Sequence, residues 1–279
     1  MLPKHCIFMN YRFLKIFIFA IFLSQNSNAA DKLPEPVTWN TQVKQLILDD
    51  QKILDGSELI ALETPYRALD AAMVPIDVRF KFRQTDNKYA KSLTIVVDEN
   101  PSPIVGTFNF TKKIGDASLS TRIRVDRYTY VRALLEMNDG KIFMVSNYVK
   151  AAGGCSAPSL ADMDAVMARL GKMKLKFIET GPKGNINKAK LIISHPNYSG
   201  LQFNQLTRAE IPAHFINVIE VYQDDNLIFS ANPDISLSED PSVTFNYLNS
   251  GGPISVKVED SEGMKFSGNY PLDKILSAK

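Results

Sequence analysis

Reactive side chains are scarce in this sequence. Its 279 residues contain two cysteines and three histidines, and Cys6 and His5 both lie within the first ten residues. The others, Cys155, His195 and His214, have no spacing to one another of the kind that zinc sites use. The Gly-rich loop that binds phosphates and the Gly-x-Ser-x-Gly motif of hydrolases are also missing. We therefore expect neither a metal site nor a bound cofactor.

A hydrophobic run long enough to span a membrane is missing too. The run at residues 16–23 is far shorter than the about 20 residues that a spanning helix needs. Basic residues precede it and a small-x-Ala cleavage site follows at residues 27–29, which is the pattern of a secretory signal peptide. Either Met1 or Met9 fits the start of this segment. The sequence thus predicts a signal peptide at 1–29 and an exported protein with no membrane span.

Cleavage after Ala29 changes the charge and the cysteine content. It removes three of the 32 Lys and Arg and none of the 30 Asp and Glu, so the formal net charge falls from +2 to −1. A protein without a basic patch is a poor candidate for nucleic-acid binding. Cys155 is then the only cysteine, which excludes an internal disulfide. A lone cysteine in an exported protein indicates a reactive thiol or an intermolecular bond.

Two patterns describe the chain between the signal peptide and residue 148. Residues 39–54 place apolar side chains on one face of a helix. Beyond them, apolar and polar residues alternate with the period of a half-buried strand. Strands are predicted at 76–83, 92–97, 104–111, 119–125, 128–137 and 141–148. Asn138-Asp139-Gly140 predicts a hairpin between the last two. Arg122, Arg124 and Arg127 fit a solvated strand face better than an anion-binding patch.

The rest of the chain begins with a helical pattern at 159–172, behind Pro158, and a turn-rich break at 180–185. Strands are predicted after the break at 189–194, 214–223, 227–230, 242–248, 254–259 and 264–269. Short strands separated by turns at this spacing indicate a β-sandwich. We therefore expect a mainly β protein with two tandem domains, at 35–180 and 184–279.

Cys155 follows two glycines and precedes Ser156-Ala157-Pro158, and three roles are open to it. A buried structural cysteine is common, but these small neighbours are unlike an apolar strand. A catalytic nucleophile needs a base, for which His195 and His214 are the candidates. A carrier thiol needs accessibility, and Gly153 and Gly154 provide a slim approach to it. The start of the predicted helix at 159 favours a lowered thiol pKa.

Motifs on both sides of this cysteine resemble the SoxYZ-like carrier proteins, in which a SoxY-like and a SoxZ-like domain share one chain. The SoxY-like motifs are TPYRALDAA (64–72), DENPSP (98–103), TRIRV (121–125) and GGC (153–155). The SoxZ-like motifs are ISHP (193–196) and IPAHFI (211–216). Together they extend over nearly all of the chain that follows the signal peptide.

This resemblance implies two immunoglobulin-like β-sandwiches in contact with each other, and a periplasmic carrier in place of an enzyme. Cys155 would hold a sulfur intermediate covalently, as in thiosulfate oxidation, with Gly153, Gly154 and Ser156 forming its supporting loop. The implied partners are sulfur-processing or quinoprotein dehydrogenase-type redox enzymes. One feature departs from the family: the SoxY cysteine lies on a free Gly-Gly-Cys-Gly-Gly arm at the chain's end, whereas Cys155 lies on an internal loop. A cysteine enzyme and a structural adaptor, cross-linked through Cys155, are the alternative functions.

Overall fold

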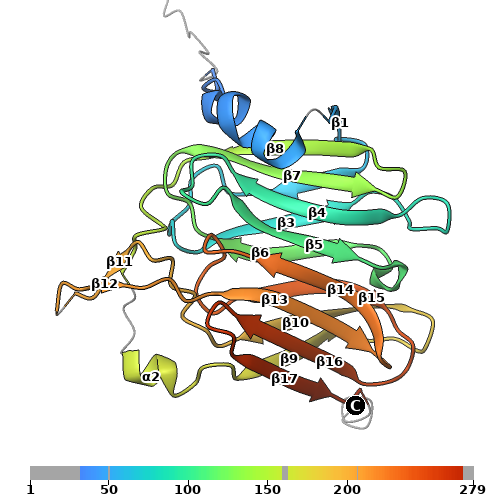
Figure 1. Ribbon diagram of the computed structural model, residues 1–279. Helices are drawn as coiled ribbons and strands as arrows, with labels where there is room; N and C mark the ends of the chain where they lie inside the picture. Colours follow the sequence, from blue (N-terminus) through green and yellow to red (C-terminus); the bar gives the residue numbers. More distant parts are fainter. Residues whose placement is uncertain (1–31, 50, 159–162, 206, 273–279) are drawn as a thin grey trace, which may run out of the picture. The chain divides into compact units, whose positions relative to one another are not determined.

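Strands predominate in the computed structural model, which describes residues 32–49, 51–158, 163–205 and 207–272 (Figure 1). The predicted signal peptide and residues 159–162 lie outside this part. Residues Glu35–Lys279 form one compact unit, to which the following description applies. A nine-stranded sheet has the order β1-β8-β7-β4-β5-β14-β13-β16-β17, and a six-stranded sheet has the order β2-β3-β6-β15-β10-β9. The prediction of a mainly β fold is confirmed.

The first half of the chain supplies eight of the named strands. They are β1 (Ile53–Asp55), β2 (Ile60–Glu63), β3 (Val74–Phe80), β4 (Ala90–Val97), β5 (Ile104–Phe110), β6 (Ser118–Ile123), β7 (Thr129–Met137) and β8 (Ile142–Val149). A 3₁₀ turn, η2 (Lys112–Ile114), precedes β6. The predicted hairpin is confirmed, because β7 and β8 pair antiparallel around Asn138-Asp139-Gly140.

The second half supplies the other nine strands. They are β9 (Met173–Glu179), β10 (Ile186–Ile193), β11 (Gln202–Phe203), β12 (Glu210–Ile211), β13 (Ile216–Gln223), β14 (Asn226–Pro233), β15 (Ser242–Leu248), β16 (Ile254–Asp260) and β17 (Lys265–Tyr270). β11 and β12 pair separately as a two-stranded sheet. The chain thus folds as two immunoglobulin-like sandwiches in tandem.

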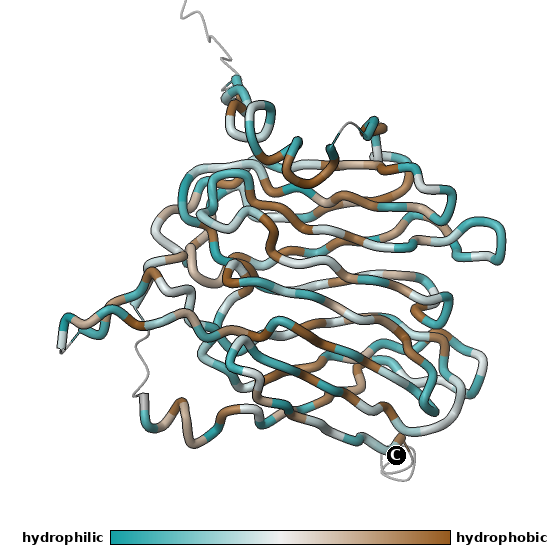
Figure 2. The backbone as a smooth tube through the Cα atoms, in the orientation of Figure 1, coloured by the Kyte–Doolittle hydropathy of each residue, from teal (hydrophilic) through white to brown (hydrophobic). Residues whose placement is uncertain are grey.

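The two halves share both sheets. β5 pairs antiparallel with β14, and β6 pairs antiparallel with β15. One hydrophobic core cluster contains buried side chains of both halves, such as Phe108 and Phe229. Hydrophobic residues are concentrated within the strands, and many connecting loops are hydrophilic (Figure 2). The predicted contact between the domains is therefore an extensive one, formed by main-chain pairing as well as by side chains.

The N-terminal helical segment is shorter than predicted. It consists of η1 (Trp39–Val43), with π-helical hydrogen bonding, and α1 (Lys44–Leu48), and residues 53–55 form β1 instead of continuing the helix. Trp39, Val43 and Leu48 pack on the outer face of the larger sheet, against Val96 of β4 and Leu134 of β7. The helical segment covers an apolar sheet face that would otherwise be exposed to water.

The region after the cysteine loop also differs from its prediction. Within the described residues the predicted helix at 159–172 is reduced to α2 (Met163–Met167), and β9 follows. β9 precedes the predicted domain break yet pairs with β10 of the second half. The domain division at 180–184 remains a proposal, and this pairing favours assigning β9 to the C-terminal domain. No helix among the described residues is long and apolar enough to cross a membrane.

Candidate functional site

The loop that carries Cys155 leaves the end of β8 and lies against the segment that follows β6. The amide of Gly153 donates to the carbonyl of Asp126 (2.8 Å), and the amide of Gly154 donates to the carbonyl of Val125 (2.9 Å). Gly153 is exposed and has φ +81°, a conformation that glycine adopts without strain. Gly154 is buried, and a Cβ atom there would lie 2.0 Å from the carbonyl oxygen of Ala71. The conformation of Gly153 and the close packing of Gly154 therefore explain why glycine occupies both positions. Neither explanation requires that a partner approach the thiol.

The other side of the loop is held by the C-terminal half. The hydroxyl of Ser199 donates to the carbonyl of Cys155, and Nε2 of Gln202 donates to the carbonyl of Ala157 (2.8 Å). Ser156 and Pro158 are exposed between these contacts. The expected internal, tethered loop is thus present, and its tethers come from both halves of the chain.

The thiol itself is sheltered. Cys155 is 0% exposed and has no disulfide partner. Burial raises the pKa of the Cys155 thiol to about 12, the negative charge of Asp126 adds to this, and the Arg124 guanidinium opposes it. The expectation of an accessible thiol with a lowered pKa is therefore wrong for this conformation. Removal from water disfavours the thiolate more than the nearby cation favours it.

Arg124 is the functional candidate that the sequence pattern missed. It is 1% exposed, so the expected solvated face does not include it. Its Nη2 donates to the carbonyl of Asn197 (3.0 Å), and its Nη1 makes a longer contact with the carbonyl of Gly154 (3.4 Å). The guanidinium therefore joins the cysteine loop to the C-terminal half. Gly154 and Asn197 are both distant from Arg124 in sequence, so no local sequence pattern predicts that Arg124 joins them.

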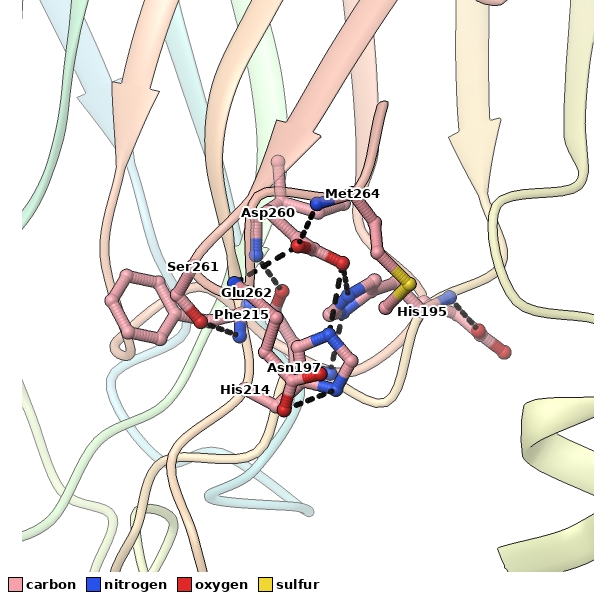
Figure 3. Close-up of polar contacts among 10 residues, drawn as sticks. His195, Asn197, His214, Phe215, Asp260, Ser261, Glu262 and Met264 are labelled. Atoms are coloured by element: carbon pink, nitrogen blue, oxygen red, sulfur yellow. Dashed lines mark hydrogen bonds and ion pairs between the residues drawn. The ribbon is translucent and has the colours of Figure 1, made fainter. Parts of the chain in front are cut away.

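A second buried cluster contains the two histidines (Figure 3). Nε2 of His214 lies 2.9 Å from Oδ2 of Asp260, and Nε2 of His195 lies 3.5 Å from the same oxygen. Oδ1 of Asp260 accepts from the amides of Glu262 and Met264 (3.0 and 2.9 Å). These main-chain bonds and the His214 bond outweigh burial, which acts in the opposite direction, and lower the pKa of Asp260. The His214–Asp260 bond therefore joins the end of β16 to the loop before β13.

Spacing along the chain gave no hint of a metal site, but the fold brings three ligand-type side chains together: atoms of His195, His214 and Asp260 lie within 4.8 Å of one another. The amide of Asn197 donates to Nδ1 of His195 (3.0 Å), which leaves the ring proton on Nε2. This Nε2 lies 3.5 Å from Oδ2 of Asp260 and makes no hydrogen bond among the described residues. A metal-binding histidine instead donates its second N–H and ligates through the free nitrogen. His195 does not fit a metal ligand, and the hydrogen bonds assign the cluster a structural role.

Neither histidine is placed as a base for Cys155. Both rings are engaged with Asp260, and neither is hydrogen-bonded to Cys155 Sγ. Burial and the neighbouring His214 lower the pKa of His195 to about 4. A nucleophile and its base are recognised by a direct hydrogen bond, which is lacking between these residues. The described geometry therefore gives no support to the cysteine-enzyme alternative.

The histidine cluster predicts acid sensitivity. The pKa of His195 lies at about 4 in the folded protein, below the 6.5 of an unperturbed histidine, so the unfolded chain binds the proton first. The stabilisation is complete above pH 6.5 and is lost as the pH falls toward 4. We expect a loss of about 2 kcal/mol in unfolding free energy between pH 7 and pH 5. Urea titrations at these pH values measure it, with His195→Gln as the control that should weaken the dependence. An equal slope in both proteins would contradict the assignment.

Comparison with known proteins agrees with the two halves seen in the structure. Residues 44–155 match the family model of the sulfur oxidation protein SoxY, and residues 175–271 match that of the sulphur oxidation protein SoxZ. Cys155 is the last residue of the SoxY match. No curated protein matches the chain.

Solved structures show only remote likeness. A superoxide reductase (neelaredoxin) from Ignicoccus hospitalis is 10% identical, with a TM-score of 0.30, and the match covers 33% of this chain and 79% of that one. A β-glycosidase from Bacteroides vulgatus is 7% identical, with a TM-score of 0.24, and the match covers 76% of this chain and 24% of that one. Likeness at this level carries no functional argument.

The two family matches, together with the β-sandwich fold of both halves, define a protein built from tandem sulfur-oxidation domains. The chain belongs to the SoxYZ-like proteins, in which a SoxY domain and a SoxZ domain are fused. Its domains give it a role in sulfur oxidation.

Proposed function

We propose that this protein is a periplasmic carrier that holds a sulfur-containing intermediate covalently on Cys155 and presents it to redox enzymes. The observation that carries the proposal is the position of Cys155: it ends the SoxY match, between the two domains, and is the only cysteine beyond the predicted signal peptide. Gly153, Gly154 and Ser156 form the loop that sets this position. The partners that we propose are sulfur-processing or quinoprotein dehydrogenase-type enzymes of the same compartment.

The simplest loading step is transfer of a sulfane sulfur from a persulfide donor. The Cys155 thiolate attacks the outer sulfur of R–S–SH, a new S–S bond forms on Cys155, and the donor S–S bond breaks. The electron pair of that bond leaves with the donor sulfur, and the proton released by Cys155 ends on the donor thiolate. The sum of oxidation states is unchanged, so the step needs no external oxidant.

Burial of the thiol supports a carrier that is unreactive until its loop opens. A thiol with a pKa of about 12 is almost entirely protonated at neutral pH, and the thiolate is the nucleophile. The loop is held by main-chain hydrogen bonds at Gly153 and Gly154, and by side-chain donors that bind the carbonyls of Cys155 and Ala157. Breaking a few such bonds costs far less than unfolding the domain. We propose that the loop opens by itself at a low rate, which allows slow loading of the isolated protein, and that a docked partner accelerates this opening.

Intact-mass measurement tests the proposal. Purified protein is incubated with a low-molecular-weight persulfide, and we expect a mass increase of one sulfur atom that reductant removes and that Cys155→Ser abolishes. The double variant Cys155→Ser/Ser156→Cys is the accessibility control, because it moves the thiol to an exposed neighbouring position. We expect iodoacetamide to alkylate this control at least about tenfold faster than the native thiol, which is buried and protonated.

Burial also favours a second candidate, a structural adaptor in which Cys155 is only a packing residue. This candidate expects no sulfur adduct on Cys155 under any loading condition, and a loss of stability in Cys155→Ala, because truncating a buried packing residue leaves a cavity. An adduct on the native protein would exclude it. A dimer cross-linked through Cys155 is disfavoured, because the thiol is 0% exposed.

A further inference from the structure

Arg124 presents a buried positive charge without a matching negative one. Its guanidinium contacts two main-chain carbonyls, and its Nε has no hydrogen-bond partner among the described residues. Among the described residues no carboxylate forms an ion pair with it, and the charges of Glu239 and Asp70 act on it from a greater distance. Burial lowers its pKa, as expected of a cation removed from water. Buried charges in proteins are normally paired, so a nearby anion would compensate the charge of Arg124.

The comparison with Arg132 makes this feature clearer. Arg132 is buried to a similar degree, but two of its nitrogens bind both carboxylate oxygens of Asp98 at 2.7 Å. Arg124 has no such carboxylate, and its longer contact is to the carbonyl of Gly154, the residue before Cys155. The charges of Arg124 and Cys155 affect each other: the cation favours the thiolate, and the thiolate favours the cation.

A cavity of about 340 Å³ adjoins this guanidinium. Arg124 lines it together with Ala157 and Pro158, which follow Cys155, and Gln202, which holds that loop. Asp70 and Glu239 also line it, and Asp126 acts on the thiol from the opposite segment. The pKa of Glu239 is raised by burial and by Asp240, which makes it a weaker competitor for the cation. The cavity therefore adjoins the cysteine loop at Ala157 and Pro158, and Cys155 itself is not one of its lining residues.

We infer that Arg124 stabilises a negatively charged sulfur group on Cys155, the thiolate during loading and the persulfide anion afterwards. This inference rests on the proposed carrier function and specifies its cargo as an anionic sulfur species. Arg124 is a positioning residue here, since its bond to the Gly154 carbonyl also fixes the loop. A guanidinium suits this role because it remains charged when buried and directs several N–H groups into one plane.

The experiment compares Arg124→Gln, Arg124→Lys and Arg79→Gln. Each variant is incubated with a low-molecular-weight persulfide, and the loaded fraction of Cys155 is measured by intact mass from pH 6 to pH 9, alongside the urea midpoint. We expect Arg124→Gln to lower the loaded-to-free ratio by about tenfold, the equivalent of one pKa unit. Arg124→Lys should keep most of the loading although it is also destabilised, because lysine keeps the charge but cannot bridge two carbonyls. Arg79→Gln is the control for loss of a positive charge alone, because Arg79 forms exposed ion pairs on the surface and does not line this cavity.

The outcomes separate the inference from the carrier proposal. Equal loading and equal pH dependence in Arg124→Gln and the native protein would overturn the inference while the carrier function stands. If the loaded fraction falls in proportion to the urea midpoint, and Arg124→Lys and Arg124→Gln are equally impaired, Arg124 only stabilises the loop. No loading of the native protein would overturn the carrier function itself. Should Arg124→Gln fail to fold, Asp126→Asn decides: removing the opposing negative charge should raise the loaded fraction, and no rise would contradict the inference.

Discussion

Gly154→Ala is expected to destabilise the protein by about 3 kcal/mol, because its extra methyl group has no space. A Cβ atom at this position would lie 2.0 Å from the carbonyl oxygen of Ala71 and 2.7 Å from that of Val125. Both contacts are with main chain, which cannot rotate away as a side chain does. The amide of Val125 is itself bonded to the Ala71 carbonyl (2.8 Å), so the cysteine loop would have to move outward as a whole.

Gly153→Ala is the matched control one residue away. Nothing lies within 4 Å of a Cβ atom there, and the cost is limited to the strain of a positive φ, about 1 kcal/mol. Urea unfolding measures both variants through the fluorescence of Trp39, the single tryptophan. Gly154→Ala should also expose Cys155 and accelerate its alkylation. Similar midpoints for the two variants would show that the loop does not need the close packing at Gly154.

The strands were largely predictable, because alternation reports burial on one face. β6 alternates buried Leu119, Thr121 and Ile123 with partly exposed residues. β9 is not among the predicted strands, although Leu175 and Phe177 alternate with Lys174 and Lys176. The predicted helix at 39–54 includes the first two residues of β1, because three residues are too few to show a period of two. The shared sheets were beyond prediction, since pairing of β5 with β14 joins segments about half the chain apart.

The site was predictable in identity but not in environment. Cys155 stands out as a lone cysteine behind two glycines, and this much needs only the sequence. Its burial depends on Val125, Ser199 and Gln202, which belong to other parts of the chain. The partners of Arg124 are equally remote, and its alternation with Ile123 and Val125 suggested a solvated face. Local pattern fails here because burial of a polar residue is decided by tertiary contacts.

The motif DENPSP, which contributed to the resemblance, has a structural explanation. Asp98 binds Arg132, and Nδ2 of Asn100 donates to the carbonyl of Arg124 (2.8 Å) and to Ser236 Oγ (2.9 Å). The hydroxyl of Ser102 donates to Oδ2 of Asp234 (2.8 Å). The motif therefore fixes the main chain at Arg124 and joins the SoxY half to the SoxZ half. It positions the cysteine region without any of its side chains bonding to Cys155.

Arg132→Met is expected to cost 3–5 kcal/mol, about the effect of removing one partner of a buried ion pair. The carboxylate of Asp98 is 2% exposed and would lose both of its 2.7 Å bonds to the guanidinium. The cation also stacks on Trp39, with its central carbon 4.2 Å from the ring centroid, so the contact between the helical segment and the sheet weakens too. Burial already raises the pKa of Asp98 against the opposing effect of Arg132, and losing the cation raises it further.

A double-mutant cycle with Asp98→Asn separates charge from packing. The double variant should be more stable than Arg132→Met alone, because a neutral amide is less costly to bury than an unpaired carboxylate. The deficit of Arg132→Met should also shrink as the pH falls and Asp98 takes up a proton, which urea titrations followed by Trp39 fluorescence would detect. Arg79→Met is the control: its ion pairs with Glu63 and Asp77 are solvent-exposed and worth at most about 1 kcal/mol. A similar loss in both single variants would mean that the Asp98–Arg132 pair contributes no more than a surface pair.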